Sequence, residues 1–157
     1  MAVRKFWLVK SEPGAYSFDD LLNEEDQTAE WDGVRNYTAR NTMRDDMQVG
    51  DGVLFYHSNS KPNAVVGYAT VVKSGYPDDT AWDPDSEHPD PRSTPDNPVW
   101  YMVDIKAENK FRSPVTLQQI KAHGDLKDMV LVNNSRLSVQ PVTNREWKII
   151  LTLGMDG

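Results

Sequence analysis

Three short stretches of the sequence place aromatic rings beside hydrogen-bonding side chains where an apolar run ends. They are 7–13, 31–37 and 55–59, and each contains a tryptophan or tyrosine together with several polar or charged residues. A pocket for a planar heterocycle needs this combination, because rings pack on its faces while donors and acceptors bind its edge. Core packing beside a turn explains each stretch taken singly. The recurrence of the pattern in three places favours a ring-binding pocket.

The sequence gives little support for other chemistry. Its histidines, His57, His88 and His123, are not at metal-ligand spacing, and there is no cysteine. A glycine-rich phosphate loop and a Gly-x-Ser-x-Gly motif are also absent from the sequence. We therefore predict a binding protein without a metal, a cofactor or a catalytic residue. Two alternatives stay open: a sensor of small molecules or nucleosides, and an enzyme that acts on a modified base through Glu12 or His57.

The acidic charge is concentrated in one segment. The formal net charge is -7, but seven acidic residues and one basic residue fall between 78 and 98. Six prolines between 77 and 98 exclude a regular helix or a central strand there, so we expect an acidic, proline-rich, solvated loop. The rest of the chain is nearly neutral and can present a basic face to a polyanion.

Apolar runs and turn residues predict a mixed fold. Helices are expected from a serine cap at Ser17, over about 36–46, and from two capping boxes at Thr116 and Thr143, the last helix stopping at Gly154. Short helices and dominant strands favour the α+β class, with a small curved sheet or barrel flanked by helices. Five runs are typical of strands: 6–10, 53–57, 65–72, 100–106 and 138–142.

The motifs in these stretches also resemble the EVE domain, a family in the PUA-like group. The resemblance runs from about Phe6 to Leu151 and is carried, in family order, by the motifs at 7–13, 31–41, 49–51, 55–58 and 135–141. It implies a PUA-like, five-stranded curved sheet or barrel flanked by short helices. EVE domains are similar to YTH domains, which hold a methylated adenine in an aromatic cage. They are regarded as readers of modified bases in DNA or as RNA-linked proteins.

The resemblance implies a base-binding pocket. A base that leaves its strand is expected to stack on Trp31, together with Trp7 or Tyr56. A methyl group on that base is expected to fill an apolar notch near Val34. The implied lining is Trp7, Lys10, Ser11, Glu12, Trp31, Val34, Asn36, Tyr56, His57, Ser58, Ser138 and Gln140.

Polar side chains complete this hypothesis. The edge of the base is expected to bind Lys10, Ser11, Asn36 and His57. For each candidate phosphate contact, surface solubility or a salt bridge is an equal alternative. These candidates are Arg35, Arg40, Arg44 and Arg136.

Length and composition predict the broader organisation. We expect one domain over 1–157, a monomer, with the acidic loop at about 77–98. No apolar run approaches the roughly 20 residues that cross a bilayer, and the N-terminal run is too short for a signal peptide. Without cysteines, these features predict a cytoplasmic protein whose partner is a nucleic acid, with the base and the kind of polymer undetermined.

Overall fold

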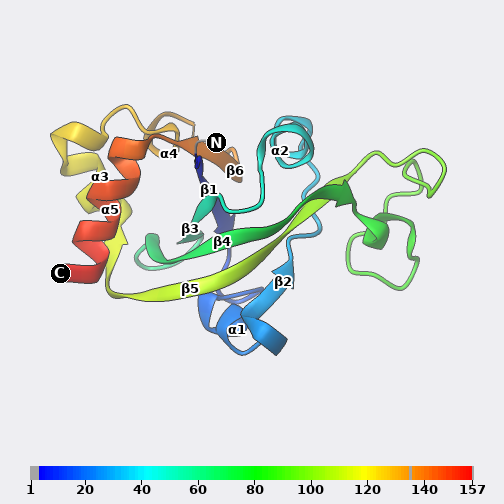
Figure 1. The fold of residues 1–157 in the computed structure, drawn as a ribbon, viewed down its shortest axis with the longest axis horizontal. Coiled ribbons are helices and arrows are strands. Elements are labelled where there is room, and N and C mark those ends of the chain that lie inside the picture. Colours follow the sequence, from blue (N-terminus) through cyan, green and yellow to red (C-terminus); the bar gives the residue numbers. More distant parts are fainter. Residues whose placement is uncertain (1–3, 135, 157) are drawn as a thin grey trace.

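The computed structural model describes residues 4–134 and 136–156 and has one mixed β-sheet surrounded by short helices (Figure 1). The strand order across the sheet is β2-β5-β4-β3-β1-β6. β1 and β3 are parallel, and the other neighbouring strands are antiparallel. The strands are β1 (Phe6–Ser11), β2 (Thr28–Glu30), β3 (Gly52–His57), β4 (Ala64–Pro77), β5 (Tyr101–Thr116) and β6 (Val139–Val142).

The helices are short, except for the last one. α3 and α5 lie at one end of the long β4–β5 pair, and the segment between these two strands projects from the other end (Figure 1). No helix among the described residues is both long and apolar enough to cross a membrane. The helices and turns are α1 (Phe18–Leu22), η1 (Glu25–Gln27), α2 (Tyr37–Asn41), η2 (Thr42–Asp46), η3 (Asp79–Trp82), α3 (Leu117–Ala122), η4 (Gly124–Leu126), α4 (Val130–Asn133) and α5 (Asn144–Asp156).

The α+β class is confirmed, but the sheet differs from the expected one. It has six strands rather than five, and it is open, because its edge strands β2 and β6 do not pair with each other within the described part of the chain. The sixth strand, β2, has only three residues between turns, too few for a recognisable alternation. β4 and β5 are longer than predicted because several register shifts change their pairing without ending it.

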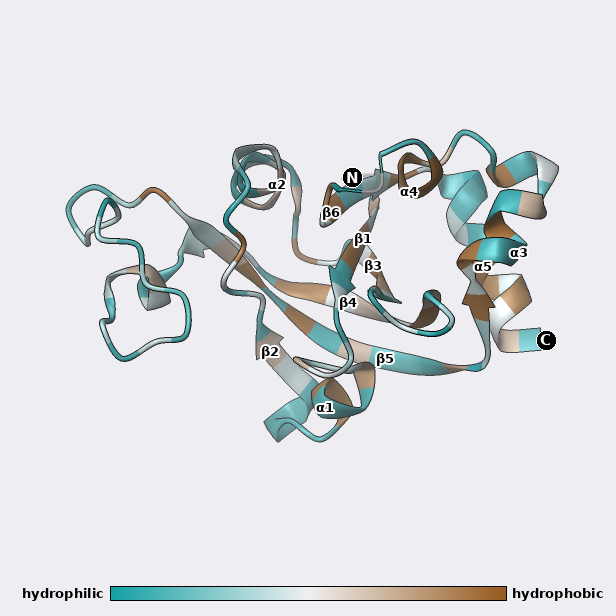
Figure 2. Ribbon diagram, turned by 180° about the vertical axis from the view of Figure 1, so that it is seen from behind, coloured by the Kyte–Doolittle hydropathy of each residue, from teal (hydrophilic) through white to brown (hydrophobic). Residues whose placement is uncertain are grey.

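The two faces of the sheet carry separate apolar clusters. Successive side chains of a strand point to opposite faces, so neighbours in sequence belong to different clusters. Trp7 and Phe55 belong to the cluster that also contains Trp31, whereas Leu8 and Leu54 belong to the other. Apolar residues recur along the central strands, and the projecting loop is mostly hydrophilic (Figure 2). This alternation decides which side chains can meet in one site.

The predicted helix starts are confirmed. Ser17 and Thr116 each form a capping box, in which the cap side chain and the third helical residue satisfy each other's backbone N–H groups. At Thr143 the same exchange occurs with Glu146. The expected helix over 36–46 is present as α2 followed by the π-helical turn η2.

Gly154 does not stop the last helix, which continues to Asp156. A Cβ atom at Gly154 would lie 2.3 Å from the ring of Phe111 on β5. The glycine therefore serves close packing of α5 on the sheet, which is a role that sequence position alone does not distinguish from a C-cap.

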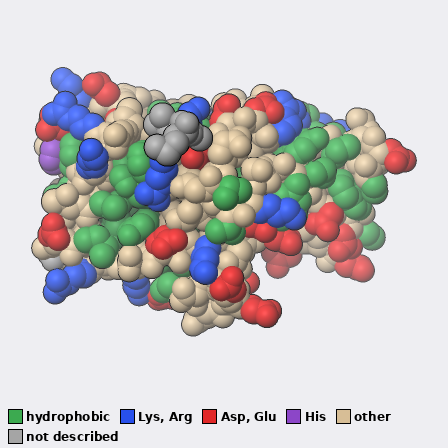
Figure 3. All heavy atoms as spheres, viewed as in Figure 1, with side chains coloured by type: hydrophobic (Ala, Val, Ile, Leu, Met, Phe, Trp, Pro, Cys, Tyr) green, Lys and Arg blue, Asp and Glu red, His purple; other side chains and the backbone are tan. Residues whose placement is uncertain are grey.

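The acidic segment is a folded lobe, so the expectation of a solvated connection is wrong in part. Ala81 and Ser93 are buried, and the Ser93 hydroxyl accepts a hydrogen bond from the backbone N–H of Val99. The carboxylate of Asp90 accepts the indole N–H of Trp100 at 2.7 Å. Several of its acids nevertheless stay exposed, and acidic side chains gather at this end of the molecule (Figure 3).

Candidate functional site

An open cleft of about 980 Å³ lies where β1 ends, beside the segment from η1 to α2. Its volume is at the upper end of the range of small-molecule sites, which is roughly 300–1,000 Å³. The cleft is lined by Lys10, Ser11, Ala15, Tyr16, Glu24, Glu25, Asp26, Thr28, Ala29, Glu30, Trp31, Asp32, Gly33, Val34, Arg35, Glu87, Asp104 and Ser138.

One ring of the predicted pocket forms part of the cleft wall. Trp31 is 8% exposed and is held by edge-to-face contacts with Tyr16, at 6.2 Å between ring centroids, and Phe55, at 5.4 Å. Its backbone N–H donates to the carbonyl of Val103, which fixes the segment against β5. Val34 lies nearby in the lining and supplies apolar surface.

The end of β1 supplies the polar side chains that were expected. Lys10 and Ser11 line the cleft, and the backbone N–H of Lys10 donates to the carbonyl of Ser138, which also lines it. Burial lowers the pKa of Lys10 below its usual value. The Ser11 hydroxyl donates to the carbonyl of Tyr16 and so ties the following turn to the strand. Five residues of the predicted pocket thus share one cleft: Lys10, Ser11, Trp31, Val34 and Ser138.

Two other rings of the predicted pocket lie elsewhere. The indole N–H of Trp7 donates to the buried carboxylate of Asp51 at 2.8 Å, beside the turn at Gly50. Tyr56 is 3% exposed and packs in the opposite apolar cluster from Trp31. Tyr56 and Trp31 belong to apolar clusters on different faces of the sheet, so this structure does not bring the two rings together around one pocket. Neither Trp7 nor Tyr56 lines the cleft.

Three polar members of the predicted pocket hold local structure together instead. The Asn36 carboxamide oxygen caps α2 by accepting the backbone N–H of Ala39 at 2.9 Å. His57 accepts the backbone N–H of Phe18 through Nε2 at 3.1 Å, and burial lowers the pKa of its imidazole. Gln140 is fully buried and donates to the carbonyl of Leu137.

Glu12 and Ser58 are engaged through their backbones. The carbonyl of Glu12 accepts the N–H groups of Ala15 and Tyr16, and the N–H of Ser58 donates to the carbonyl of Ser11. Neither residue lines the cleft, and nor do Asn36, His57 and Gln140. The two residues considered as an acid or base, Glu12 and His57, are therefore both outside it. The described residues include no cluster of three or more side chains placed to hold a metal ion.

The cleft is strongly acidic, which sequence reasoning did not anticipate. Seven carboxylate residues line it against two basic ones, Lys10 and Arg35. Burial raises the pKa of Asp32, and the nearby Asp78 raises it further while His88 opposes the rise. Burial also raises the pKa of Glu30, with Asp104, Asp79 and Asp32 adding repulsion. A ligand that donates hydrogen bonds relieves this crowding, whereas a phosphate would add to it.

Tyr16 is a second feature that sequence reasoning missed. Burial, followed by the charges of Glu24, Asp20 and Asp32, raises the pKa of Tyr16 to about 12, so its hydroxyl stays protonated. That hydroxyl is buried and has no hydrogen-bond partner among the described residues. The sequence did carry one indication that Tyr16 is packed against the fold. Tyr16 stands immediately before the N-cap of α1, where an apolar residue commonly packs back onto the helix.

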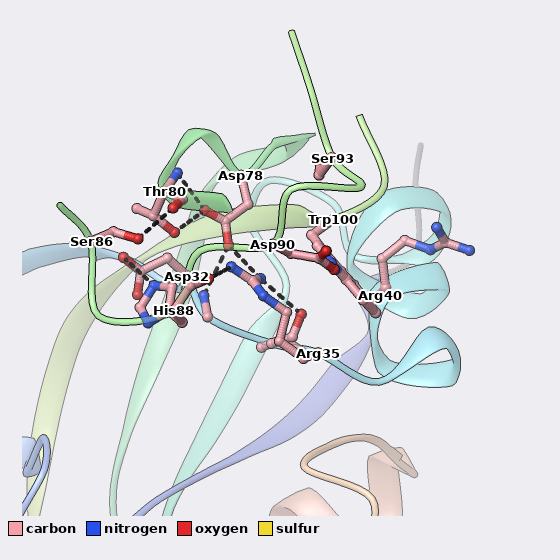
Figure 4. A network of polar contacts seen from close by, with 12 residues as sticks. Asp32, Arg35, Arg40, Asp78, Thr80, Ser86, His88, Asp90, Ser93 and Trp100 are labelled. Carbon is pink, nitrogen blue, oxygen red and sulfur yellow. Dashed lines mark hydrogen bonds and ion pairs between the residues drawn. The ribbon is translucent and has the colours of Figure 1, made fainter. Parts of the chain in front are cut away.

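A buried network joins the cleft to the acidic lobe (Figure 4). The carboxylate of Asp78 is fully buried and accepts hydrogen bonds from the Gly33 N–H at 2.9 Å, from Thr80 and from Arg35 at 3.0 Å. Burial alone would raise the pKa of Asp78, but the bonds from Thr80, Gly33 and Arg35 lower it on balance. Gly33 has φ +75°, and a Cβ there would lie 2.9 Å from the ring of His88.

The candidate phosphate contacts have different surroundings. Arg35 is bound to Asp78 and, at 2.7 Å, to the carbonyl of His88. Arg44 pairs with Asp45 at 2.8 Å, and Arg136 is exposed. Arg40 donates to the side-chain oxygen of Asn41 and to the carbonyl of Val99, both uncharged acceptors. The hydrogen bonds of Arg40 thus go to uncharged groups, whereas Arg35 and Arg44 form ion pairs with carboxylates.

Comparisons with known proteins agree with this architecture. The EVE domain family model matches residues 5–153. Thymocyte nuclear protein 1 of Danio rerio is 42% identical over 164 residues, which cover 94% of this chain and 71% of that protein. A hypothetical protein from Leishmania major has a structure with a TM-score of 0.91 and 47% identity, covering 97% of this chain and 95% of that one.

The most informative relative is human THYN1, whose crystal structure is a complex with DNA that contains 5-methylcytosine. It is 39% identical with a TM-score of 0.89, and the match covers 96% of this chain and 97% of that one. Sequence motifs, fold and near full-length similarity lead to one conclusion: the chain belongs to the EVE domain family.

Proposed function

We propose that this protein binds DNA that contains a modified cytosine and holds the modified base in the acidic cleft without chemical change. The complex of human THYN1 with DNA containing 5-methylcytosine supports the class of ligand. The observation that carries the proposal is the cleft itself, in which the ring of Trp31 is surrounded by hydrogen-bond acceptors. A base inside a duplex is stacked and paired, so it must leave the stack before it enters the cleft.

The charge of the cleft selects the part of a nucleotide that enters it. Cytosine presents an exocyclic amino group, and carboxylates are the side chains that accept from it. Asp32 and Glu30 are the acceptors nearest in sequence to Trp31, and both line the cleft. Both carboxylates repel a phosphate, so a phosphate is disfavoured in the same space. The cleft thus admits the base and leaves its phosphate outside.

Recognition of the modification is assigned to apolar contact. Val34 lies in the lining, and burial of one methyl group against it contributes about 0.8 kcal/mol, which is a fourfold preference. Such a small preference implies that rejection of other bases depends on the shape and the acceptors of the cleft.

A titration tests this function. Oligonucleotides with 5-methylcytosine, with cytosine and with thymine are titrated at two salt concentrations, together with the free nucleosides. We expect the methylated oligonucleotide to bind most tightly, with an affinity that falls steeply with salt, because phosphate contacts release counterions. Equal affinity for all three oligonucleotides would contradict base recognition, and turnover of any ligand would contradict binding without chemistry.

A sensor of free nucleosides is the second candidate, and the acidic lining of the cleft favours it. Such a sensor would bind 5-methyl-2′-deoxycytidine as tightly as the oligonucleotide, with little dependence on salt.

The expected cytoplasmic location stays a prediction, since the vertebrate relatives are named as nuclear proteins. A single domain over 1–157, a monomeric state and membership of the PUA-like group also stay predictions.

A further inference from the structure

A second concave surface lies next to the cleft. We call it the rim groove; its volume is about 340 Å³, and it shares Arg35 with the cleft. Its position is set by the network of Figure 4, which fastens the acidic lobe to the segment that follows Trp31. The rim groove is lined by Arg35, Tyr37, His88, Pro89, Asp90, Arg92 and Trp100.

The rim groove contains an exposed aromatic platform. Tyr37 is 52% exposed, although it is stacked on buried Trp100 with 5.0 Å between centroids and 28° between planes. Trp100 is fixed in turn by its bond to Asp90 and by Arg35, whose guanidinium carbon lies 5.5 Å from the Trp100 ring. An exposed ring on a rigid support offers a planar ligand a surface that is already ordered.

Cations surround this platform. The guanidinium carbon of Arg40 lies 5.0 Å from the centroid of Tyr37, and its hydrogen bonds go to uncharged acceptors. Arg92 is 68% exposed and pairs with Asp90 at 2.9 Å. Asp90 and the hydroxyl of Tyr37 both raise the pKa of Arg92. Arg35 and Arg92 are each paired with one carboxylate, so Arg40 carries the excess positive charge that favours an anionic group beside the rim groove, in contrast with the acidic cleft.

We propose that the rim groove binds the nucleotide next to the base held in the cleft. Its base or sugar packs on Tyr37, and its phosphate is bound by Arg40 and Arg92. A ring with neighbouring arginines is the combination that single-stranded nucleic acids require. The inference rests on the proposed function. The two sites adjoin at Arg35, so the rim groove receives the neighbouring nucleotide when a base occupies the cleft.

The test compares a polymer with a monomer. Binding of a short methylated oligonucleotide is measured by fluorescence anisotropy, and binding of 5-methyl-2′-deoxycytidine by calorimetry. We expect Tyr37→Ala to weaken oligonucleotide binding about tenfold, since the variant removes the ring on which a base would stack. Tyr37→Phe keeps the ring and should bind within about twofold of the parent, and neither variant should change nucleoside binding. Tyr37 is half exposed, so both variants should fold, which thermal unfolding verifies.

A charge variant provides an independent measurement. Arg92→Gln should reduce the slope of log affinity against log salt by about 1, as loss of one phosphate contact does. Arg145→Gln is the matched control, because Arg145 also forms an exposed pair, with Asp125 at 2.8 Å, and lies outside both concave surfaces. An unchanged slope for Arg92→Gln would overturn the phosphate assignment.

The outcomes separate the two proposals. Oligonucleotide binding that is unaffected by Tyr37→Ala overturns the rim groove while leaving the cleft intact. Equal losses of oligonucleotide and nucleoside binding in Tyr37→Ala also overturn it, because they indicate a disturbed cleft. If oligonucleotide binding depends on Tyr37 but not on Trp31, the proposed function fails, and the assignment to a neighbouring nucleotide fails with it.

Discussion

The cleft and the rim groove share Arg35 but have opposite electrostatic character. The cleft surrounds one tryptophan with carboxylates, whereas the rim groove surrounds an exposed tyrosine with arginines. A nucleotide also has two unlike parts, a base edge with hydrogen-bond donors and an anionic phosphate. On the proposed function, this contrast would let a protein with a formal charge of -7 bind a polyanion, with the base at the acidic surface and the phosphates at the arginines.

The largest expected effect comes from breaking the network that holds the two regions together. Asp78→Ala removes a fully buried carboxylate and leaves Arg35 without its partner, so we expect a loss of about 3–5 kcal/mol in the free energy of unfolding. Urea denaturation measures the change. Asp85→Ala, an exposed acid in the same lobe, is the control and should have little effect.

The contribution of Asp78 also depends on pH. Its pKa is lowered in the folded protein, so its stabilising effect is present above the pKa of the unfolded chain and is lost as pH falls through the folded pKa. The difference between the parent and Asp78→Ala should therefore shrink in acid. A difference that is constant down to low pH would show that the charge of Asp78 does not stabilise the fold.

The second effect concerns the wall of the cleft. Trp31→Leu keeps an apolar side chain but removes the ring, and it should weaken binding of the methylated oligonucleotide and of the free nucleoside by the same factor, about 30-fold. Trp31→Phe should restore most of the affinity of both ligands. Affinity that does not change in a folded Trp31→Leu protein would place the base elsewhere.

The third effect tests the acidic character of the cleft. Asp32→Asn removes a charge-assisted hydrogen bond to the amino group of the base, so we expect about tenfold weaker binding of cytosine bases. The same variant should unfold at a higher temperature at neutral pH, because the pKa of Asp32 is raised by burial and its charge is unfavourable in the fold. This gain should be absent below the unfolded pKa and complete above the folded pKa. A lower unfolding temperature of Asp32→Asn would contradict the inference that the charge of Asp32 is unfavourable in the fold.

The smallest effect sharpens the role of the methyl group. Val34→Ala should reduce the preference for 5-methylcytosine over cytosine by about fourfold, the equivalent of one buried methyl group. Competition titrations with two oligonucleotides that differ only in that methyl group measure the ratio directly. An unchanged ratio would mean that another surface contacts the methyl group.

The sequence was sufficient for the parts of the fold that depend on local patterns. Capping boxes at Thr116 and Thr143 and the cap at Ser17 are local hydrogen-bond exchanges, so their residues identify them. The strand β2 was not predicted, because its pairing with β5 depends on residues that are distant in the sequence. Gly154 was misassigned because its close approach to Phe111 is a tertiary contact.

The candidate site was predictable only in part for a similar reason. Trp31 and Val34 belong to one short segment, so their proximity follows from the sequence. Trp7 and Tyr56 satisfied the same chemical pattern, but the alternation of side chains along paired strands places Tyr56 on the other face. The acidity of the cleft arises from η1, β2, β5 and the projecting lobe, which are brought together only by the fold.

A crystal structure of this protein with a single-stranded oligonucleotide containing one 5-methylcytosine tests most directly whether the cleft holds the base while the arginines of the rim groove bind the phosphate. We predict that the methylated base lies in the cleft against Trp31, with its amino group at a carboxylate, and that the adjoining phosphate lies at Arg40 and Arg92. A phosphate inside the acidic cleft, or a methylated base that stays outside it, would contradict the central claim.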